Sequence, residues 1–192
     1  KKWHENVYEY LQSTPFITEL VLENHNQTKL DFSKTSPHRL SLDMTGVEEL
    51  ILNDDLEELI LLGEITKDCK IKAYENGANL LLQPDKTIPK LQGLKDLGKL
   101  HLMNITELDI EEILTEYPKL RELRLWGKPG NLVHFDRVSE FKELEVLTTM
   151  DLFGFTAEDI PRPDSLPNLH RFWMNSLPED AAKVAKKLYK KR

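Results

Sequence analysis

The chain has 192 residues, of which 40% are hydrophobic and 31% charged, and its formal net charge is −7. This composition is typical of a globular domain, and no apolar run approaches the roughly 20 residues that a membrane-spanning helix needs. The excess of acids argues against a nucleic-acid-binding surface, where clustered basic residues are expected. The single cysteine, Cys69, excludes an internal disulfide framework and favours a reducing compartment, so we expect a cytoplasmic location.

The first expected element is a helix over residues 2–12. Trp3, Val7 and Leu11 recur at every fourth position and therefore share one helical face. Pro15 ends this pattern. An amphipathic helix at one end of a repeated structure favours a role as an N-terminal cap, assigned to residues 1–15. A helix that binds a partner is the alternative.

From Phe16 the pattern changes to short apolar pairs that recur about every ten residues. A period of two within each pair predicts a strand with both apolar side chains on one face. Alternate pairs lie about 20 residues apart, which favours coils with one strand on each side, stacked in parallel. A β-meander of hairpins is the competing interpretation, although few connections carry a hairpin turn such as Asn76-Gly77. The predicted ladder along one side comprises Leu22, Leu42, Leu61, Leu82 and Leu102.

A longer phrase, L-x-x-L-x-L, follows the short pairs. Its four copies, of which the last two are degraded, begin at Leu97, Leu120, Leu144 and Leu169. The starts are separated by 23, 24 and 25 residues, which leaves room for helices behind the strands. A helix is expected over residues 109–117, where Ile110, Ile113 and Leu114 share one face before Pro118.

The end of the chain predicts a second cap over residues 176–192. Ser176 and Glu179 have the spacing of a capping box at the start of a helix. The apolar stripe that follows consists of Ala181, Val184, Ala185 and Leu188. Lysines near the C-terminal end suit the negative end of the helix dipole, which explains them without a nucleic acid or lipid.

The copies at Leu97, Leu120 and Leu169 resemble leucine-rich repeat proteins, and the phrase at residues 175–180 resembles the end of bacterial leucine-rich repeat domains. The resemblance implies an α/β fold, namely a single-domain solenoid with a curved parallel β-sheet over residues 1–192. Short two-stranded coils are expected over residues 16–96, and helix-backed coils over residues 97–175. The family binds proteins or other large ligands on its concave strand face and shares no catalytic motif.

No specific catalytic or cofactor motif stands out, and we expect neither a cofactor nor a metal. Cys69 is most simply a small buried hydrophobe; a nucleophile is the alternative. Eight acids and no basic residue lie between Leu40 and Thr66. This acidic block is usual for a solvated face, and steering of a basic partner is the alternative.

The residues between the repeated leucines are expected on the concave face. Those selected as partner-binding residues are Lys99, His101, Met103, Arg124, Trp126, Arg171 and Trp173. Tryptophan and arginine are enriched at interaction hot spots, and an exposed indole needs a reason. The alternative is a structural role, in which Trp126 and Trp173 cover neighbouring coils or stack on Arg124 and Arg171.

These observations favour a non-enzymatic interaction module that binds a protein partner, with no nucleic acid and no membrane span. An enzyme or small-ligand protein that uses His101, Arg124 and a nearby acid is a second hypothesis. A structural spacer within a larger protein is the third.

Overall fold

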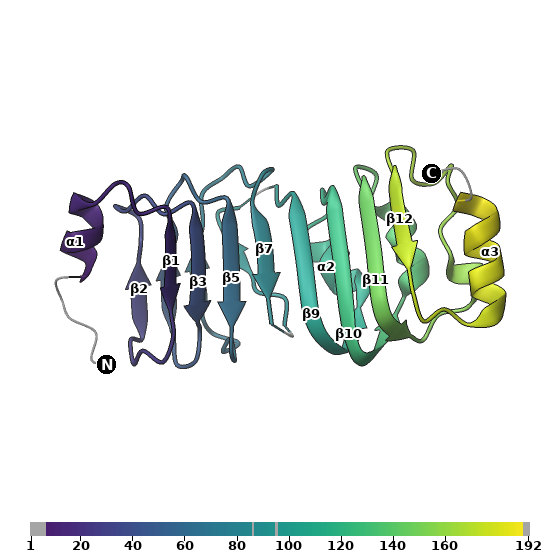
Figure 1. The fold of residues 1–192 in the computed structure, drawn as a ribbon, viewed down its shortest axis with the longest axis horizontal. Helices are drawn as coiled ribbons and strands as arrows, with labels where there is room; N and C mark the ends of the chain where they lie inside the picture. The colour runs from purple at the N-terminus through teal and green to yellow at the C-terminus, as the bar shows by residue number, and fades with distance from the viewer. Residues whose placement is uncertain (1–6, 86, 95, 190–192) are drawn as a thin grey trace. The chain divides into compact units, whose positions relative to one another are not determined.

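The computed structural model describes residues 7–85, 87–94 and 96–189, and it divides into two compact units (Figure 1). Unit 1 is Lys1–Leu97 and unit 2 is Gly98–Arg192. The division falls where the repeats lengthen in the sequence. Both units are built from parallel β-sheets with few helices, so the α/β class with parallel sheets is confirmed.

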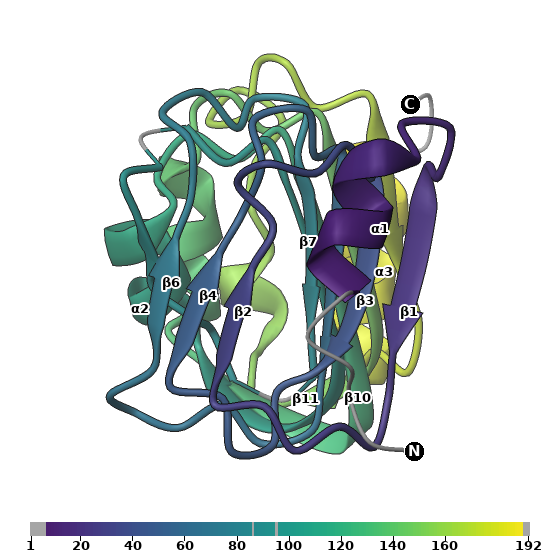
Figure 2. The ribbon, with the colours of Figure 1, turned by 90° about the vertical axis from the view of Figure 1, so that its left-hand side faces the viewer.

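Alternate strands of unit 1 belong to two different sheets, which Figure 2 shows as separate layers. The first sheet contains β1 (Glu19–Leu22), β3 (Arg39–Asp43), β5 (Glu58–Leu62) and β7 (Leu81–Pro84). The second contains β2 (Lys29–Asp31), β4 (Glu49–Ile51), β6 (Lys70–Lys72) and β8 (Leu91–Gln92). Every strand pair within the described residues is parallel, so the meander of hairpins is wrong.

Leucines in register form the core between these two sheets. Leu40 pairs with Leu20 and Leu59 in one ladder, and Leu50 pairs with Leu30 and Ile71 in the other. Apart from Leu20, at the end of its sheet, these side chains are almost completely buried. Burial of one leucine is worth about 1.5–3 kcal/mol, so the rows of leucines contribute the main attraction between the two layers.

The predicted ladder is correct for Leu22, Leu42 and Leu61 but wrong for Leu82. Leu61 lies opposite Pro84, and Leu82 lies opposite Leu59. The connection at residues 73–80 is two residues longer than the corresponding connection at residues 52–57, which shifts β7 by one side-chain pair. A shift of two residues keeps leucine on the buried face and is therefore tolerated.

Unit 2 contains one parallel sheet in the order β9, β10, β11, β12. Its strands are β9 (Lys99–Asp109), β10 (Glu122–Val133), β11 (Val146–Phe153) and β12 (Arg171–Met174). The connections hold α2 (Ile110–Glu116) and the 3₁₀ helices η1 (Phe135–Glu140) and η2 (Ala157–Asp159). The helix predicted at residues 109–117 is thus present, with Ile110 and Ile113 buried and Asp109 capping its first turn. A helix behind every strand is not evident.

Strands β9 and β10 are longer than the repeated phrase predicts. After a register shift in β10, Leu108 pairs with Leu132 and both side chains are buried. Asn104 lies at the turning point of β9, with a left-handed backbone at φ 56°. Asparagine is one of the few residues that adopt this conformation readily. The strand therefore changes direction without ending.

The same left-handed conformation recurs at one position of the repeat. In five strands, though not in β3 or β10, this position lies two residues after the second inward-facing residue, which is apolar except for Thr149 of β11. It is occupied by Asn24, Gly63, Asn104, Asp151 and Ser176. Glycine, asparagine and aspartate adopt positive φ at low cost, so the recurrence has a steric basis.

The chain ends carry α1 (Val7–Ser13) and α3 (Glu179–Tyr189). Trp3 and the start of the first predicted helix lie outside the described residues. On α3, Ala181, Ala185 and Tyr189 are buried, as the apolar stripe predicts for the first two. The predicted capping box is wrong, because Ser176 has φ 56° and its hydroxyl donates to Asp151 at 2.7 Å. None of the helices described is both long and apolar enough to span a membrane.

Candidate functional site

The candidate site is the surface of unit 2 that faces away from the buried leucines. Strand register arranges its side chains in rows that cross the sheet. The first row is Lys99, Glu122, Val146 and Arg171. The second row is His101, Arg124, Thr148 and Trp173. The third contains Trp126 and Met150, and Met103 follows His101 on β9. We call these eleven residues the strand face.

Glu122 is the centre of a cluster of polar side chains on this face. Its Oε1 lies 2.5 Å from His101 Nε2 and 2.8 Å from Arg124 Nε. The side chains of His101, Glu122 and Arg124 are 12%, 18% and 30% exposed. The contact with Arg124 has the geometry of an ion pair rather than of a hydrogen bond. One carboxylate therefore orients two of the residues selected from the sequence.

Lys99 and Arg171 carry charges that the described part of the chain does not neutralise. The side chain of neither residue forms an ion pair or a hydrogen bond with a described residue. They occupy opposite ends of the first row, with Glu122 and the buried Val146 between them. Together with Arg124, they exceed the single negative charge of Glu122, so the strand face is cationic.

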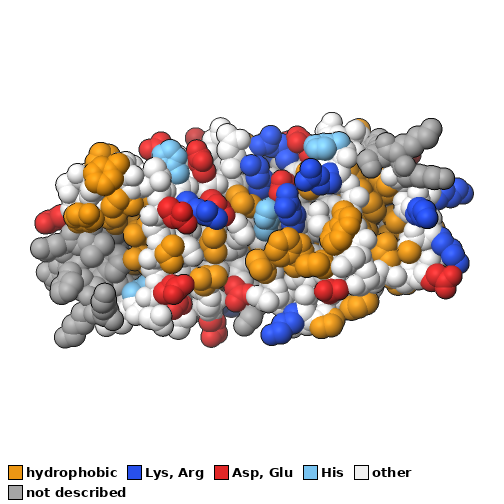
Figure 3. Space-filling model, viewed as in Figure 1, with side chains coloured by type: hydrophobic (Ala, Val, Ile, Leu, Met, Phe, Trp, Pro, Cys, Tyr) orange, Lys and Arg blue, Asp and Glu red, His pale blue; other side chains and the backbone are white. Residues whose placement is uncertain are grey.

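Apolar side chains lie beside these charges. Trp173 is 47% exposed and Met103 is 38% exposed, whereas Trp126 and Met150 are partly covered. Figure 3 shows basic and histidine side chains gathered over β9 and β10, next to hydrophobic ones. Among the described residues, no ring or cation contact involves either indole. The stacking expected as an alternative is therefore not seen there, and Trp173 exposes an apolar surface without a covering partner.

The seven residues selected from the sequence thus lie on one sheet, but they do not form one compact cluster. Lys99, His101, Met103, Arg124 and Trp126 come from the neighbouring strands β9 and β10. Arg171 and Trp173 come from β12, which β11 separates from β10. Sequence reasoning did not select Glu122 or Met150. Their position in the repeat was readable, but their contacts depend on strand register.

A second cluster of polar side chains lies at the starts of α2 and η1. Nδ1 of His134 lies 2.9 Å from Asp109 Oδ1 and 3.8 Å from Glu111 Oε2. One ligand atom from each residue falls within 4.8 Å of the others, a spacing that a metal ion could bridge. Arg137 approaches Glu111 at 3.2 Å and already supplies a positive charge. This cluster is explained as an ion-paired helix cap.

The acidic block of unit 1 is partly neutralised by basic residues of neighbouring strands. Glu49 lies 2.7 Å from Lys29 and 2.6 Å from Lys72, and hydrogen bonds from these two lysines lower its pKa to about 2. Arg39 lies 2.7 Å from Glu58 and 3.7 Å from Glu19. Glu49 and Glu58 of the block are thus ion-paired within unit 1, which reduces the negative charge available to steer a basic partner.

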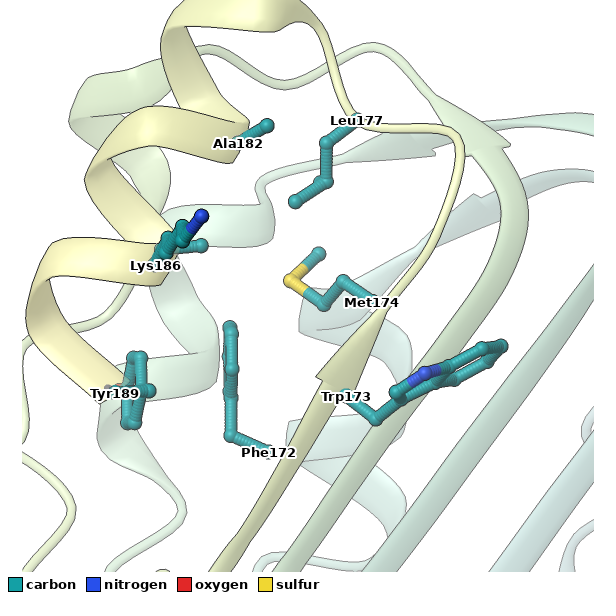
Figure 4. A pocket seen from close by; sticks show the side chains of 8 residues that line it. Phe172, Trp173, Met174, Leu177, Ala182, Lys186 and Tyr189 are labelled. Atoms are coloured by element: carbon teal, nitrogen blue, oxygen red, sulfur yellow. The ribbon is translucent and has the colours of Figure 1, made fainter. Parts of the chain in front are cut away.

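Two other features offer less chemistry. Partial burial raises the pKa of the Cys69 thiol, which disfavours the thiolate that a nucleophile requires. A hollow of about 320 Å³ lies between β12 and α3, lined mainly by apolar side chains (Figure 4). Phe172 and Met174 point from β12 toward α3 there, whereas Trp173 points away.

Comparisons with protein-family models, curated proteins and solved structures found no match to this chain.

Proposed function

We propose that the chain is a leucine-rich repeat solenoid. The support comes from strand pairing at sequence offsets near 20 residues, as for Leu20 with Leu40 and Leu30 with Leu50. This offset lies at the short end of the range for leucine-rich repeats. The recurrent left-handed residue after the strands, including Asn24 and Asn104, adds a second periodic feature.

The solenoid serves as a non-enzymatic interaction module whose strand face binds a segment of a partner protein. One observation carries this proposal: exposed Trp173 and Met103 flank a face on which Lys99 and Arg171 have no ion-pair partner among the described residues. Exposed tryptophan and arginine side chains are enriched at interaction hot spots, and a rigid sheet limits the backbone entropy that is lost on binding.

The contact between His101 and Glu122 favours a second candidate, an enzyme or small-ligand site. A histidine oriented by a carboxylate is a common acid–base arrangement. In that case, His101→Gln would abolish turnover of a small substrate. A protein-binding module instead retains its partner when His101 is replaced, provided that the apolar side chains remain.

The test compares the proteins captured by the immobilised unaltered chain with those captured by the immobilised double variant Met103→Ala/Trp173→Ala. Each side chain is about half covered by its neighbours, so we expect each replacement to lower the free energy of unfolding by about 1–2 kcal/mol without preventing folding. The double variant should lose a protein that the unaltered chain retains.

The matched control is Phe16→Ala with Val21→Ala, which removes exposed apolar side chains from unit 1. This control should retain the same protein. Equal capture by both double variants would contradict the proposal, and so would failure of the strand-face variant to fold.

A further inference from the structure

We infer that the partner segment is an extended acidic peptide in which acidic residues alternate with large apolar residues. This inference rests on the proposed function, since it assigns the chemistry of a ligand to the same strand face. The rows of side chains on the sheet differ in charge and polarity, and these differences determine which partner side chains they can accept.

The distribution of charge favours an acidic ligand. Unit 1 has 17 acidic and 11 basic residues, whereas unit 2 has 16 and 15, so nearly all of the net charge of −7 belongs to unit 1. Within the almost neutral unit 2, the strand face presents Lys99, Arg124 and Arg171 against Glu122. A ligand of complementary charge for this face carries carboxylates.

The spacing of the basic residues fits an extended peptide. Lys99 and Arg171 stand three strands apart in one row. Parallel strands lie about 4.8 Å apart, so their backbones are separated by about 14 Å. An extended peptide advances about 3.3 Å per residue, and four residues therefore span this distance. Acidic side chains at positions i and i+4 of a crossing peptide match the two basic residues.

An apolar surface lies on the other side of such a peptide. Trp126 and Met150 form the third row, and Trp173 of the second row lies beside them on β12. Side chains of an extended peptide alternate in direction. A segment lying across the second row therefore sends acids toward the first row and apolar side chains toward the third.

Nucleic acid and anionic lipid also offer negative charge, but they match the apolar row less well. A nucleic acid can stack a base on an indole, but it has no aliphatic side chain to pack on Met103 and Met150. A lipid surface would contact Trp173 and the basic residues, but its charged headgroups have no fixed spacing that would match the distance between Lys99 and Arg171. The acidic peptide accounts for both rows at once.

In the experiment, a library of random dodecapeptides displayed on phage is selected for binding to the immobilised full chain. Selected peptides are then measured for affinity to the unaltered chain, to Lys99→Glu with Arg171→Glu, and to Lys34→Glu with Lys67→Glu. The last variant makes the same change of charge on exposed positions of unit 1. Single-stranded oligonucleotides and vesicles with anionic lipid serve as the other probes.

We expect selected peptides to carry at least two acids about four residues apart, with aromatic or aliphatic residues between them. Their affinity should fall at least about tenfold in the Lys99/Arg171 variant, which corresponds to about 1.4 kcal/mol, and stay unchanged in the control.

Other outcomes separate the two proposals. Neutral or basic peptides that lose affinity when Trp173 is replaced by alanine would overturn the acidic chemistry and leave the proposed function standing. Peptides that bind without dependence on the strand face, or no selected peptides at all, would overturn both. Tighter binding of oligonucleotides or anionic vesicles through Lys99 and Arg171 would also overturn the inference.

Discussion

Asp109 and His134 connect the start of α2 to the start of η1 through one side-chain contact. Hydrogen bonding to Asp109 raises the pKa of His134 above its ordinary value of 6.5. Burial acts to raise the pKa of Asp109, but hydrogen bonds from His134 and the Glu111 backbone outweigh it and lower the pKa below 3.8. Both residues are therefore charged across a window that includes mildly acidic pH.

The sign of the pH dependence follows from these shifts. A raised histidine pKa stabilises the fold below pH 6.5, and the effect is lost as pH rises through the raised value. The Asp109 contribution is present above pH 3.8 and is lost as pH falls through its lowered value. We expect His134→Asn, which tolerates the left-handed backbone, to lower the unfolding midpoint at pH 5.5 but not at pH 9.

The same pair can be followed by NMR titration of the His134 ring. Its midpoint should lie above 6.5 in the unaltered chain and move toward 6.5 in Asp109→Asn. Asparagine still caps a helix, so this variant removes charge with little loss of the cap. A midpoint at or below 6.5 in the unaltered chain would contradict the assignment.

Individual residues also show where sequence reasoning reaches its limit. The period of two places His101 and Arg124 on one surface, because strand geometry leaves no other choice. The contact of both with Glu122 depends on which residues of β9 and β10 stand opposite each other, and that register is a tertiary property. The degree of cover over Trp126 was unpredictable for the same reason.

Among the elements, β10 depends on two glycines. A Cβ at Gly127 would overlap the carbonyl oxygen of Asp151, and one at Gly130 would overlap that of Ile105. The strand register shifts between these positions, and neighbouring backbones approach closely there. The leucine pattern predicted the first half of β10 but not its continuation, because glycines between strands are ordinarily a sign of a loop.

We expect Gly130→Ala to destabilise the chain by about 1–3 kcal/mol, since a neighbouring strand must move to admit the methyl group. Lys128→Ala is the control, because Lys128 is an exposed residue of the same strand. Urea unfolding measures both variants. Equal stability of Gly130→Ala and the unaltered chain would show that the sheet accommodates a Cβ at this position.

At the scale of the whole molecule, the strands of unit 1 alternate between two sheets. The repeat in the sequence and the offset between paired residues therefore have the same period, about 20 residues. Arg39 stands opposite both Glu19 and Glu58, and Glu49 stands opposite Lys29 and Lys70. The recurrence of leucines predicted this parallel pairing. The helices at the ends were also foreseen in position, whereas the interruption at β7 was not, because loop length carries no periodic signal.

Removal of residues 39–57 joins His38 to Glu58 and should leave a folded chain with β5 beside β1. The shortened chain brings Glu19 opposite Glu58, and Lys29 opposite Lys70. We expect a lower unfolding midpoint that rises more steeply with added NaCl than that of the unaltered chain, because salt screens like charges. Circular dichroism with thermal unfolding measures this.

Two controls belong with the deletion. Glu58→Arg in the shortened chain restores an opposite charge beside Glu19 and should recover part of the lost stability. Removal of residues 39–48 deletes half a repeat, transfers later strands to the wrong sheet and should prevent folding. A folded half-repeat deletion would contradict the ladder.

The contact between α3 and β12 has a consequence for the protein in concentrated solution. Within the described residues β12 pairs with β11 alone, and an uncovered strand edge recruits strands from other molecules. Tyr189 stacks on Phe172 with ring centres 3.9 Å apart, and its hydroxyl donates to Pro161 at 2.7 Å, which fixes α3 beside β12 (Figure 1). The exposed Lys186 and Lys187 add repulsion between copies. We therefore expect α3 to oppose strand addition at β12, and its removal to favour fibrous or amorphous aggregates over a dispersed protein.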